Sequence, residues 1–188
     1  MQVKLSSTTA VQGRAKTSMP QILRLADAGL YNAWGMAIVD LPDETATAAL
    51  AARIAAVAAP ADIIALKGDL GTGKTAFARA FIRACGNQDE VPSPTFTLVQ
   101  VYDAGPTEIW HFDLYRIRAP EEAWELGIEE AFITGISLIE WPERLGPLLP
   151  DRRLELGFAF GDGPGARRIA MDPGKGWQER LATIAADA

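Results

Sequence analysis

The chain has 188 residues, of which 48% are hydrophobic and 22% are charged, and it carries a formal net charge of −6. The apolar content excludes a wholly disordered chain, and the acidic balance argues against a broad basic surface that holds nucleic acid unaided. One cysteine, Cys85, permits neither an internal disulfide nor a cysteine cluster for zinc, and no apolar run approaches the length of a membrane span. We therefore expect a cytoplasmic protein that binds neither a membrane nor DNA.

Residues 1–35 differ in composition from the rest of the chain. They carry several lysines and arginines and no acidic residue before Asp27. An organelle-targeting peptide can have this composition, and a loose extension or a start placed too far upstream explains it equally well. We treat residues 1–35 as an N-terminal extension, expected to be flexible, and residues 36–188 as one domain.

The first elements predicted in this domain are a strand at 35–39 and an amphipathic helix at 45–58. Turn and capping residues around Glu44 begin the helix, apolar side chains follow at helical spacing, and Pro60 ends it. A short apolar run at 61–66 then predicts a buried parallel strand.

Residues 68–75 match the phosphate-binding pattern G-x-x-x-x-G-K-[ST] at every fixed position, reading Gly-Asp-Leu-Gly-Thr-Gly-Lys-Thr. The preceding strand and a run of helix formers at 76–85, closed by Gly86, supply the flanking elements that this motif requires. Its glycines let backbone N–H groups converge on phosphate oxygens, and the helix adds the positive end of its dipole. Lys74 is expected to reach the β- and γ-phosphates, and the Thr75 hydroxyl to ligate Mg²⁺. The motif therefore predicts a site for a nucleoside triphosphate.

The base of this nucleotide is predicted to be adenine. A guanine signature of the form Asn-Lys-x-Asp is absent from the sequence. We expect the adenine to sit against the helix start at 43–45, and we expect ATP and Mg²⁺ as cofactors.

Residues 91–113 are predicted to form a hairpin at one side of a mainly parallel sheet. Two prolines give an extended start, and β-branched and aromatic residues continue as a strand to Tyr102. A turn at 103–106 leads into a returning strand that ends at Asp113. A short helix with proline at its start and glycine at its end follows.

Several polar side chains of this region have two interpretations. Ser93, Thr95 and Thr97 lie where P-loop proteins sense the γ-phosphate, and turn-forming hydroxyls beside prolines explain them equally well. Asp113 is placed to help catalysis or to begin a turn. His111, the only histidine of the chain, alternates with aromatic residues, which is more typical of a structural histidine than of a general base.

A second apolar strand is predicted at 136–140 and ends in an acid. A buried strand that carries a carboxylate to its C-terminal edge is typical of a Walker-B element beside the phosphate loop. We therefore favour a metal-binding or water-orienting role for Glu140 over that of a capping or solvated acid. Trp141 follows this acid directly, which distinguishes it from the other tryptophans, interpreted as core or interface anchors.

The end of the chain is predicted to form two strands and a helix. Residues 154–160 alternate between apolar and other side chains, residues 161–165 form a turn, and residues 167–171 return. Arg167 and Arg168 could contact the nucleotide, but a solvated turn edge is the stronger expectation for both. The predicted fold is a three-layer α/β fold of the P-loop NTPase type, with a mainly parallel central sheet and an antiparallel hairpin.

Four segments, in this order and spacing, resemble the bacterial TsaE family, formerly the YjeE family. They are 68–75, 93–99 (Ser-Pro-Thr-Phe-Thr-Leu-Val), 111–116 (His-Phe-Asp-Leu-Tyr-Arg) and 139–143 (Ile-Glu-Trp-Pro-Glu). The resemblance covers about residues 37–185, and the combination is far more specific than the phosphate-binding motif alone.

The resemblance implies a small ATPase needed to make N6-threonylcarbamoyladenosine in tRNAs that read codons beginning with A. In the family, TsaE docks on the TsaD–TsaB pair, which holds the chemistry, and its ATP cycle is understood to reset that complex between turnovers. We therefore expect a weak ATPase that its partners stimulate and that meets tRNA mainly through them.

The resemblance also implies roles for residues at matching positions. Thr75 and Glu140 are implied Mg²⁺ ligands, Asp113 is an implied catalytic acid, and Trp141 matches a tryptophan important for activity. The implied catalytic set is Lys74, Asp113, Glu140 and Trp141. The implied nucleotide contacts are Glu44, Gly68, Gly71, Thr72, Gly73, Lys74, Thr75 and Ala76.

Two other functions are compatible with the same motif. A small-molecule kinase could use Asp113 and Arg116 to hold a phosphoryl acceptor, although no arginine-rich lid follows the strand at 136–140. A nucleotide-dependent switch with negligible turnover would have partner binding as its output.

Overall fold

The computed structural model describes residues 37–186. Residues 1–36, which include the predicted N-terminal extension, and residues 187–188 lie outside the described residues. In chain order the elements are β1 (Ala37–Leu41), α1 (Glu44–Ala55), β2 (Ile63–Lys67), α2 (Lys74–Ala84), β3 (Val99–Asp103), β4 (Glu108–Asp113), η1 (Pro120–Leu126), α3 (Ile128–Thr134), β5 (Ile136–Glu140), η2 (Pro142–Leu148), β6 (Leu154–Phe160), β7 (Arg167–Pro173) and α4 (Gln178–Ala186). None of these helices has the length and apolar character needed to cross a membrane.

The strands form one mixed sheet with the order β1-β7-β6-β2-β5-β4-β3. At its centre, β2 pairs in parallel with β5 and β6, and β4 pairs in parallel with β5. The pairs β1–β7, β6–β7 and β3–β4 are antiparallel. The predicted α/β fold with its antiparallel hairpin is confirmed. The sheet is mixed because the turn at 161–165 is too short for a parallel crossover, so β7 returns beside β6.

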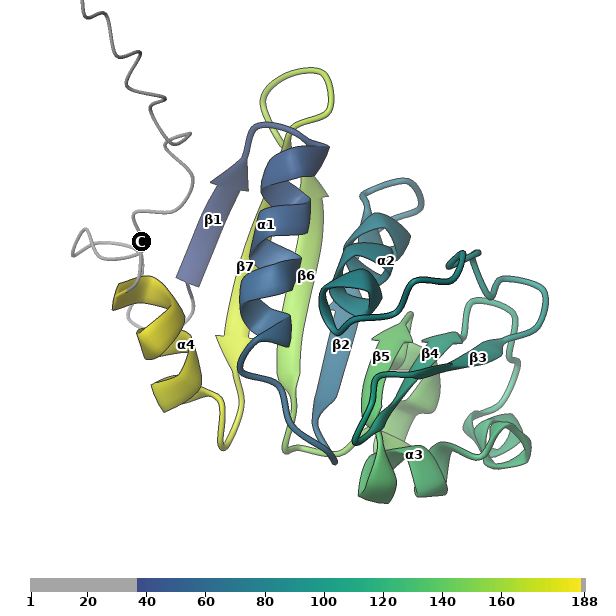
Figure 1. Ribbon diagram of the computed structural model, residues 1–188. Coiled ribbons are helices and arrows are strands. Elements are labelled where there is room, and N and C mark those ends of the chain that lie inside the picture. The colour runs from purple at the N-terminus through teal and green to yellow at the C-terminus, as the bar shows by residue number, and fades with distance from the viewer. Residues whose placement is uncertain (1–36, 187–188) are drawn as a thin grey trace, which may run out of the picture.

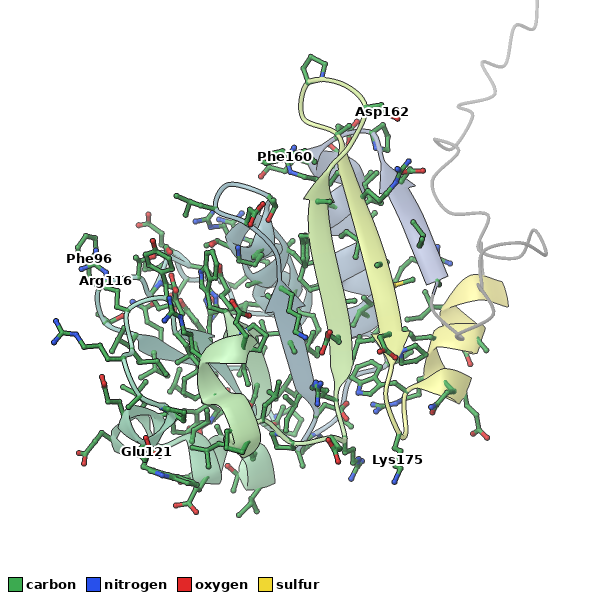
Figure 2. All side chains as sticks on the ribbon, turned by 180° about the vertical axis from the view of Figure 1, so that it is seen from behind. Phe96, Arg116, Glu121, Phe160, Asp162 and Lys175 are labelled. Atoms are coloured by element: carbon green, nitrogen blue, oxygen red, sulfur yellow. The ribbon has the colours of Figure 1, made fainter. Side chains whose placement is uncertain are left out.

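Helices cover the two faces of the sheet unequally (Figure 1). Apolar side chains of α1, α2 and α4 share one core with the strands, and those of η1, α3 and η2 share a second core on the opposite face. Seen from behind, no helix of the described residues crosses β6 and β7 (Figure 2). Strand β6 accordingly alternates between buried and partly exposed positions, as its sequence pattern predicts.

The two main helices begin and end at residues suited to those positions. Asp43 precedes α1 in an extended conformation, and its Oδ1 accepts a hydrogen bond from the Ala46 N–H at 2.8 Å. A side-chain oxygen at this point satisfies one of the free N–H groups of the first turn. Gly86 follows α2 with φ 99°, the left-handed conformation that the sequence predicts there.

The predicted strand through residues 91–102 is wrong in its first half. Residues 94–97 form a turn in which the Leu98 N–H donates to the Pro94 carbonyl at 2.6 Å, and β3 begins only at Val99. Leu98 itself has φ 67°. The two prolines therefore lead into a turn that folds back over the end of the sheet, and not into a longer strand.

A buried ion pair attaches α4 to the start of β2. Asp62, which is 2% exposed, accepts hydrogen bonds from the Arg180 guanidinium at 2.5 and 2.9 Å and from the Ala59 N–H at 2.7 Å. The same guanidinium lies 3.9 Å from the centre of the Trp177 ring. These contacts hold the C-terminal helix against the core on the α1 side.

We expect Arg180→Met to lower the free energy of unfolding by about 3 kcal/mol, because it leaves the Asp62 carboxylate buried without its cation. Urea unfolding measures this change. The double variant with Asp62→Asn should recover part of the loss, since the uncompensated charge is then gone. Equal and additive losses from the two substitutions would contradict the ion-pair explanation.

Candidate active site

The loop between β2 and α2 needs its glycines for two physical reasons. Gly68 has φ 132°, and a Cβ atom there would lie 2.3 Å from the Phe158 carbonyl oxygen, so no larger residue fits beside β6. Gly73 precedes α2 with φ 104°. The N–H groups of the first turn of α2 have no partner within the helix, which leaves them free to bind an anion. The predicted phosphate-binding loop thus has the backbone that its motif requires.

A cavity of about 350 Å³ lies at this loop. It brings together residues from five parts of the chain: the loop and α2, the turn after the prolines, the ends of β4 and β5, and the start of β7. The predicted site residues among its lining are Gly71, Gly73, Lys74, Thr75, Ala76, Asp113, Glu140 and Trp141.

Three predicted nucleotide contacts do not line this cavity. Gly68 lies beneath the loop against Phe158. Thr72 is buried, and its hydroxyl donates to the Asp69 carbonyl at 2.8 Å. Glu44 is an exposed residue in the first turn of α1. Gly68 and Thr72 shape the loop, and the nucleotide contact of Glu44 stays a prediction.

Lys74 is one of two cations that line the cavity in the described part of the chain, the other being Arg167. The Lys74 side chain lies in the site and not in solvent, with Nζ donating to the carbonyls of Gly68 at 2.6 Å and Asp69 at 2.8 Å. The ammonium lies 4.1 Å from the centre of the Trp141 ring, within range of a cation–π interaction. Burial lowers the pKa of Lys74, and the carboxylate of Glu140 is the first of several that raise it in part.

Trp141 has an unusual backbone conformation at the end of β5. Its φ of 59° is left-handed, which is uncommon for a bulky residue and tends to occur at functional sites. The ring of Tyr115 packs against it with centroids 4.9 Å apart. This conformation places the indole under the Lys74 ammonium, directly beside the acid of the strand.

Glu140 and Thr75, the two predicted Mg²⁺ ligands, lie in direct contact at the end of β5 and the start of α2. The Thr75 hydroxyl donates to Glu140 Oε2 at 2.9 Å, and the Glu140 side chain is almost fully buried. No group of three or more His, Cys, Asp or Glu side chains that could hold a metal occurs among the described residues. Two oxygen ligands fit Mg²⁺, which usually takes one or two protein groups and completes its shell with phosphates and water.

Asp113 lies beside Glu140 because β4 and β5 pair in that register. Its Oδ2 accepts from the Thr95 hydroxyl at 2.6 Å, and the Thr95 hydroxyl also lies 2.8 Å from Ser93 Oγ. The other carboxylate oxygen of Asp113, Oδ1, accepts a hydrogen bond from the Tyr115 N–H at 3.1 Å. Asp113 therefore begins a turn and also lines the cavity, and its role in catalysis stays a prediction.

Two further residues lie at or beside the site, and the sequence analysis favoured another role for each of them. Arg167 is half-buried after the turn, lines the cavity and lies over the ring of Phe160, so the expected solvated turn edge describes it only in part. Arg168 is exposed and pairs with Asp40. His111 Nε2 lies 2.9 Å from Glu140 Oε1. His111 and Asp113 are two residues apart on a strand, which places both side chains on one face of the sheet. This spacing was the signal in the sequence that could have associated His111 with the site.

Comparison with known proteins agrees with the motifs. The family profile described as threonylcarbamoyl adenosine biosynthesis protein TsaE matches residues 41–169. The chain belongs to the TsaE family. Threonylcarbamoyladenosine is a tRNA modification, and the chain takes part in its biosynthesis.

Relatives and a solved structure support TsaE membership. The chain is 43% identical over 123 residues to the tRNA threonylcarbamoyladenosine biosynthesis protein TsaE of Rickettsia bellii, which covers 65% of this chain and 85% of the relative. It is 40% identical over 116 residues to TsaE of Bacillus subtilis, covering 61% and 71%. The crystal structure of Bacillus subtilis YdiB matches with a TM-score of 0.69 and 28% identity, covering 81% of this chain and 95% of YdiB.

Proposed function

We propose that this TsaE-family chain is a Mg²⁺-dependent ATPase that acts on the TsaD–TsaB pair in the cytoplasm. One observation carries the proposal: Asp113 and Glu140 end neighbouring strands in register, at the cavity that Lys74 and Thr75 line. This is the arrangement of a cation, a hydroxyl and two acids that phosphoryl transfer from a nucleoside triphosphate uses.

Each of these residues has a distinct task in hydrolysis. The N–H groups at the start of α2 and the Lys74 ammonium would bind the phosphates, and Thr75 and Glu140 would hold the metal. When bound, Mg²⁺ would supply charge neutralisation of the phosphates. Asp113 orients the attacking water, and its hydrogen bond from Thr95 keeps one carboxylate oxygen in a fixed direction.

The TsaD–TsaB pair is proposed as the partner on the strength of family membership, and tRNA is proposed to be met mainly through it. The net charge of −6 supports this division, because a protein with this charge repels the tRNA backbone. We propose that partner docking completes the part of the site that positions the attacking water. The isolated chain should therefore hydrolyse ATP slowly.

A kinase is the weaker alternative. It would need Arg116 to face the cavity together with Asp113, but the Arg116 guanidinium lies 4.6 Å from the ring centre of Phe96, which is 83% exposed. Figure 2 shows these two side chains together at the surface. Arg116 is not among the residues that line the cavity.

The test measures ATP consumption by the isolated chain and after addition of the TsaD–TsaB pair. We expect slow Mg²⁺-dependent release of phosphate from the chain alone and at least about tenfold faster release with the pair, because partner-supplied groups raise turnover in related NTPases by far more than this. Transfer of phosphate to an added metabolite would favour the kinase. Nucleotide binding without turnover under either condition would favour the switch.

A further inference from the structure

His111 reaches the proposed metal-binding carboxylate from inside the sheet. In the parallel pairing of β4 with β5, His111 lies opposite Leu138, and Glu140 lies two residues further along. His111 and Glu140 are therefore diagonal neighbours on one face, a separation that a long side chain can span. The imidazole is fully buried, and its Nε2 lies 2.9 Å from Glu140 Oε1.

The two oxygens of the Glu140 carboxylate have different partners. Oε1 meets His111, and Oε2 accepts from the Thr75 hydroxyl. The terminal torsion of a glutamate is broad, so a carboxylate held at one oxygen only can turn among many orientations. The contact with His111 at one oxygen restricts this freedom and keeps the other oxygen beside Thr75.

The donors and acceptors of the Glu140 and His111 side chains indicate which nitrogen of the imidazole carries the proton. An ionised carboxylate only accepts hydrogen bonds, so the proton of this contact belongs to Nε2 of His111. The other ring nitrogen, Nδ1, is buried and has no partner among the described residues. A proton on Nδ1 would be buried and unsatisfied, whereas a proton on Nε2 is used.

We propose that His111 is a positioning residue that orients Glu140, so that Oε2 and the Thr75 hydroxyl face the metal together. The inference rests on the proposed Mg²⁺–ATP function and assigns a task to a residue that this function does not otherwise use. Partners that orient a metal ligand from the second layer typically change metal affinity about 10- to 100-fold when removed. A histidine that only fills the core would affect folding and leave metal binding unchanged.

Two variants separate orientation from packing. His111→Leu keeps apolar volume and removes the donor, and His111→Gln places an amide N–H at the reach of Nε2. ADP binding is measured by calorimetry with each chain, first in EDTA and then with Mg²⁺. The ratio of the two Kd values isolates the contribution of the metal from that of the phosphate loop.

We expect His111→Leu to reduce the Mg²⁺-dependent gain in ADP affinity by at least about tenfold, with the affinity in EDTA within about twofold of wild type. His111→Gln should restore most of the gain. A wild-type gain in His111→Leu would overturn the inference, as would an equal loss in His111→Gln. If the wild-type chain bound no ADP with or without Mg²⁺, the proposed function itself would fail.

A measurement on the unmodified chain does not depend on whether a variant folds. Because His111 is the only histidine, its imidazole nitrogens can be assigned without ambiguity in an NMR spectrum of the untagged, ¹⁵N-labelled protein. We expect a proton on Nε2, and a change in the Nε2 shift when Mg²⁺ is added to the ADP-bound chain. A proton on Nδ1 alone would contradict the contact with Glu140 and overturn the inference.

Discussion

Lys74→Ala is expected to lower the affinity for ATP by about 30- to 5,000-fold. Loss of one partner from a desolvated charge pair costs about 2 to 5 kcal/mol, and each 1.4 kcal/mol is a factor of ten in Kd. Lys74 is buried in the cavity, so its ammonium is largely desolvated and this range applies to it. Calorimetric titration with a non-hydrolysable ATP analogue measures the change.

The control for this experiment is Lys175→Ala. Lys175 lies in an exposed turn at the opposite end of the sheet from the loop that follows β6 (Figure 2). The substitution removes the same charge and side chain without touching the cavity, so ATP affinity should stay within about twofold of wild type, as expected for a distant exposed charge. Unchanged affinity in Lys74→Ala would refute the assignment of the site.

Glu140→Gln is expected to reduce Mg²⁺-dependent ATP turnover by at least about 100-fold. A metal ion contributes several kcal/mol to stabilisation of a phosphoryl-transfer transition state, and a neutral amide is a poorer ligand than a carboxylate. The substitution keeps the volume and one oxygen for the contact with His111, so the fold should persist. ATP affinity in EDTA should stay close to wild type, because the phosphate loop is intact.

The matched control is Glu143→Gln. Glu143 is an exposed acid three residues further along, in the first turn of η2, and it does not line the cavity. Its change removes the same charge near Lys74 without removing a proposed ligand. Phosphate release by this control should match that of wild type, and wild-type turnover in Glu140→Gln would remove that residue from the mechanism.

Local signals predicted the elements that carry the site. The glycine pattern at 68–75, the buried strand ending in Glu140 and the returning strand ending in Asp113 all form as expected. Each depends on a property of a short segment: φ angles that only glycine adopts readily, or a run of apolar residues that ends in an acid. The turn at 94–97 was missed because β-branched and aromatic residues favour a strand locally, whereas the hydrogen bond from Thr95 to Asp113 comes from a distant strand.

The residue pattern of short segments was enough to predict a glycine-rich loop of the phosphate-binding type between a strand and a helix, and an acid at the end of a later strand. The register that pairs β4 with β5 and puts Asp113 beside Glu140 is known only from the folded chain, as are the positions of Arg167 and His111. The reason is physical. Loop conformation follows from the residues of the loop, but contacts across a sheet follow from strand order and register, which many distant residues set together.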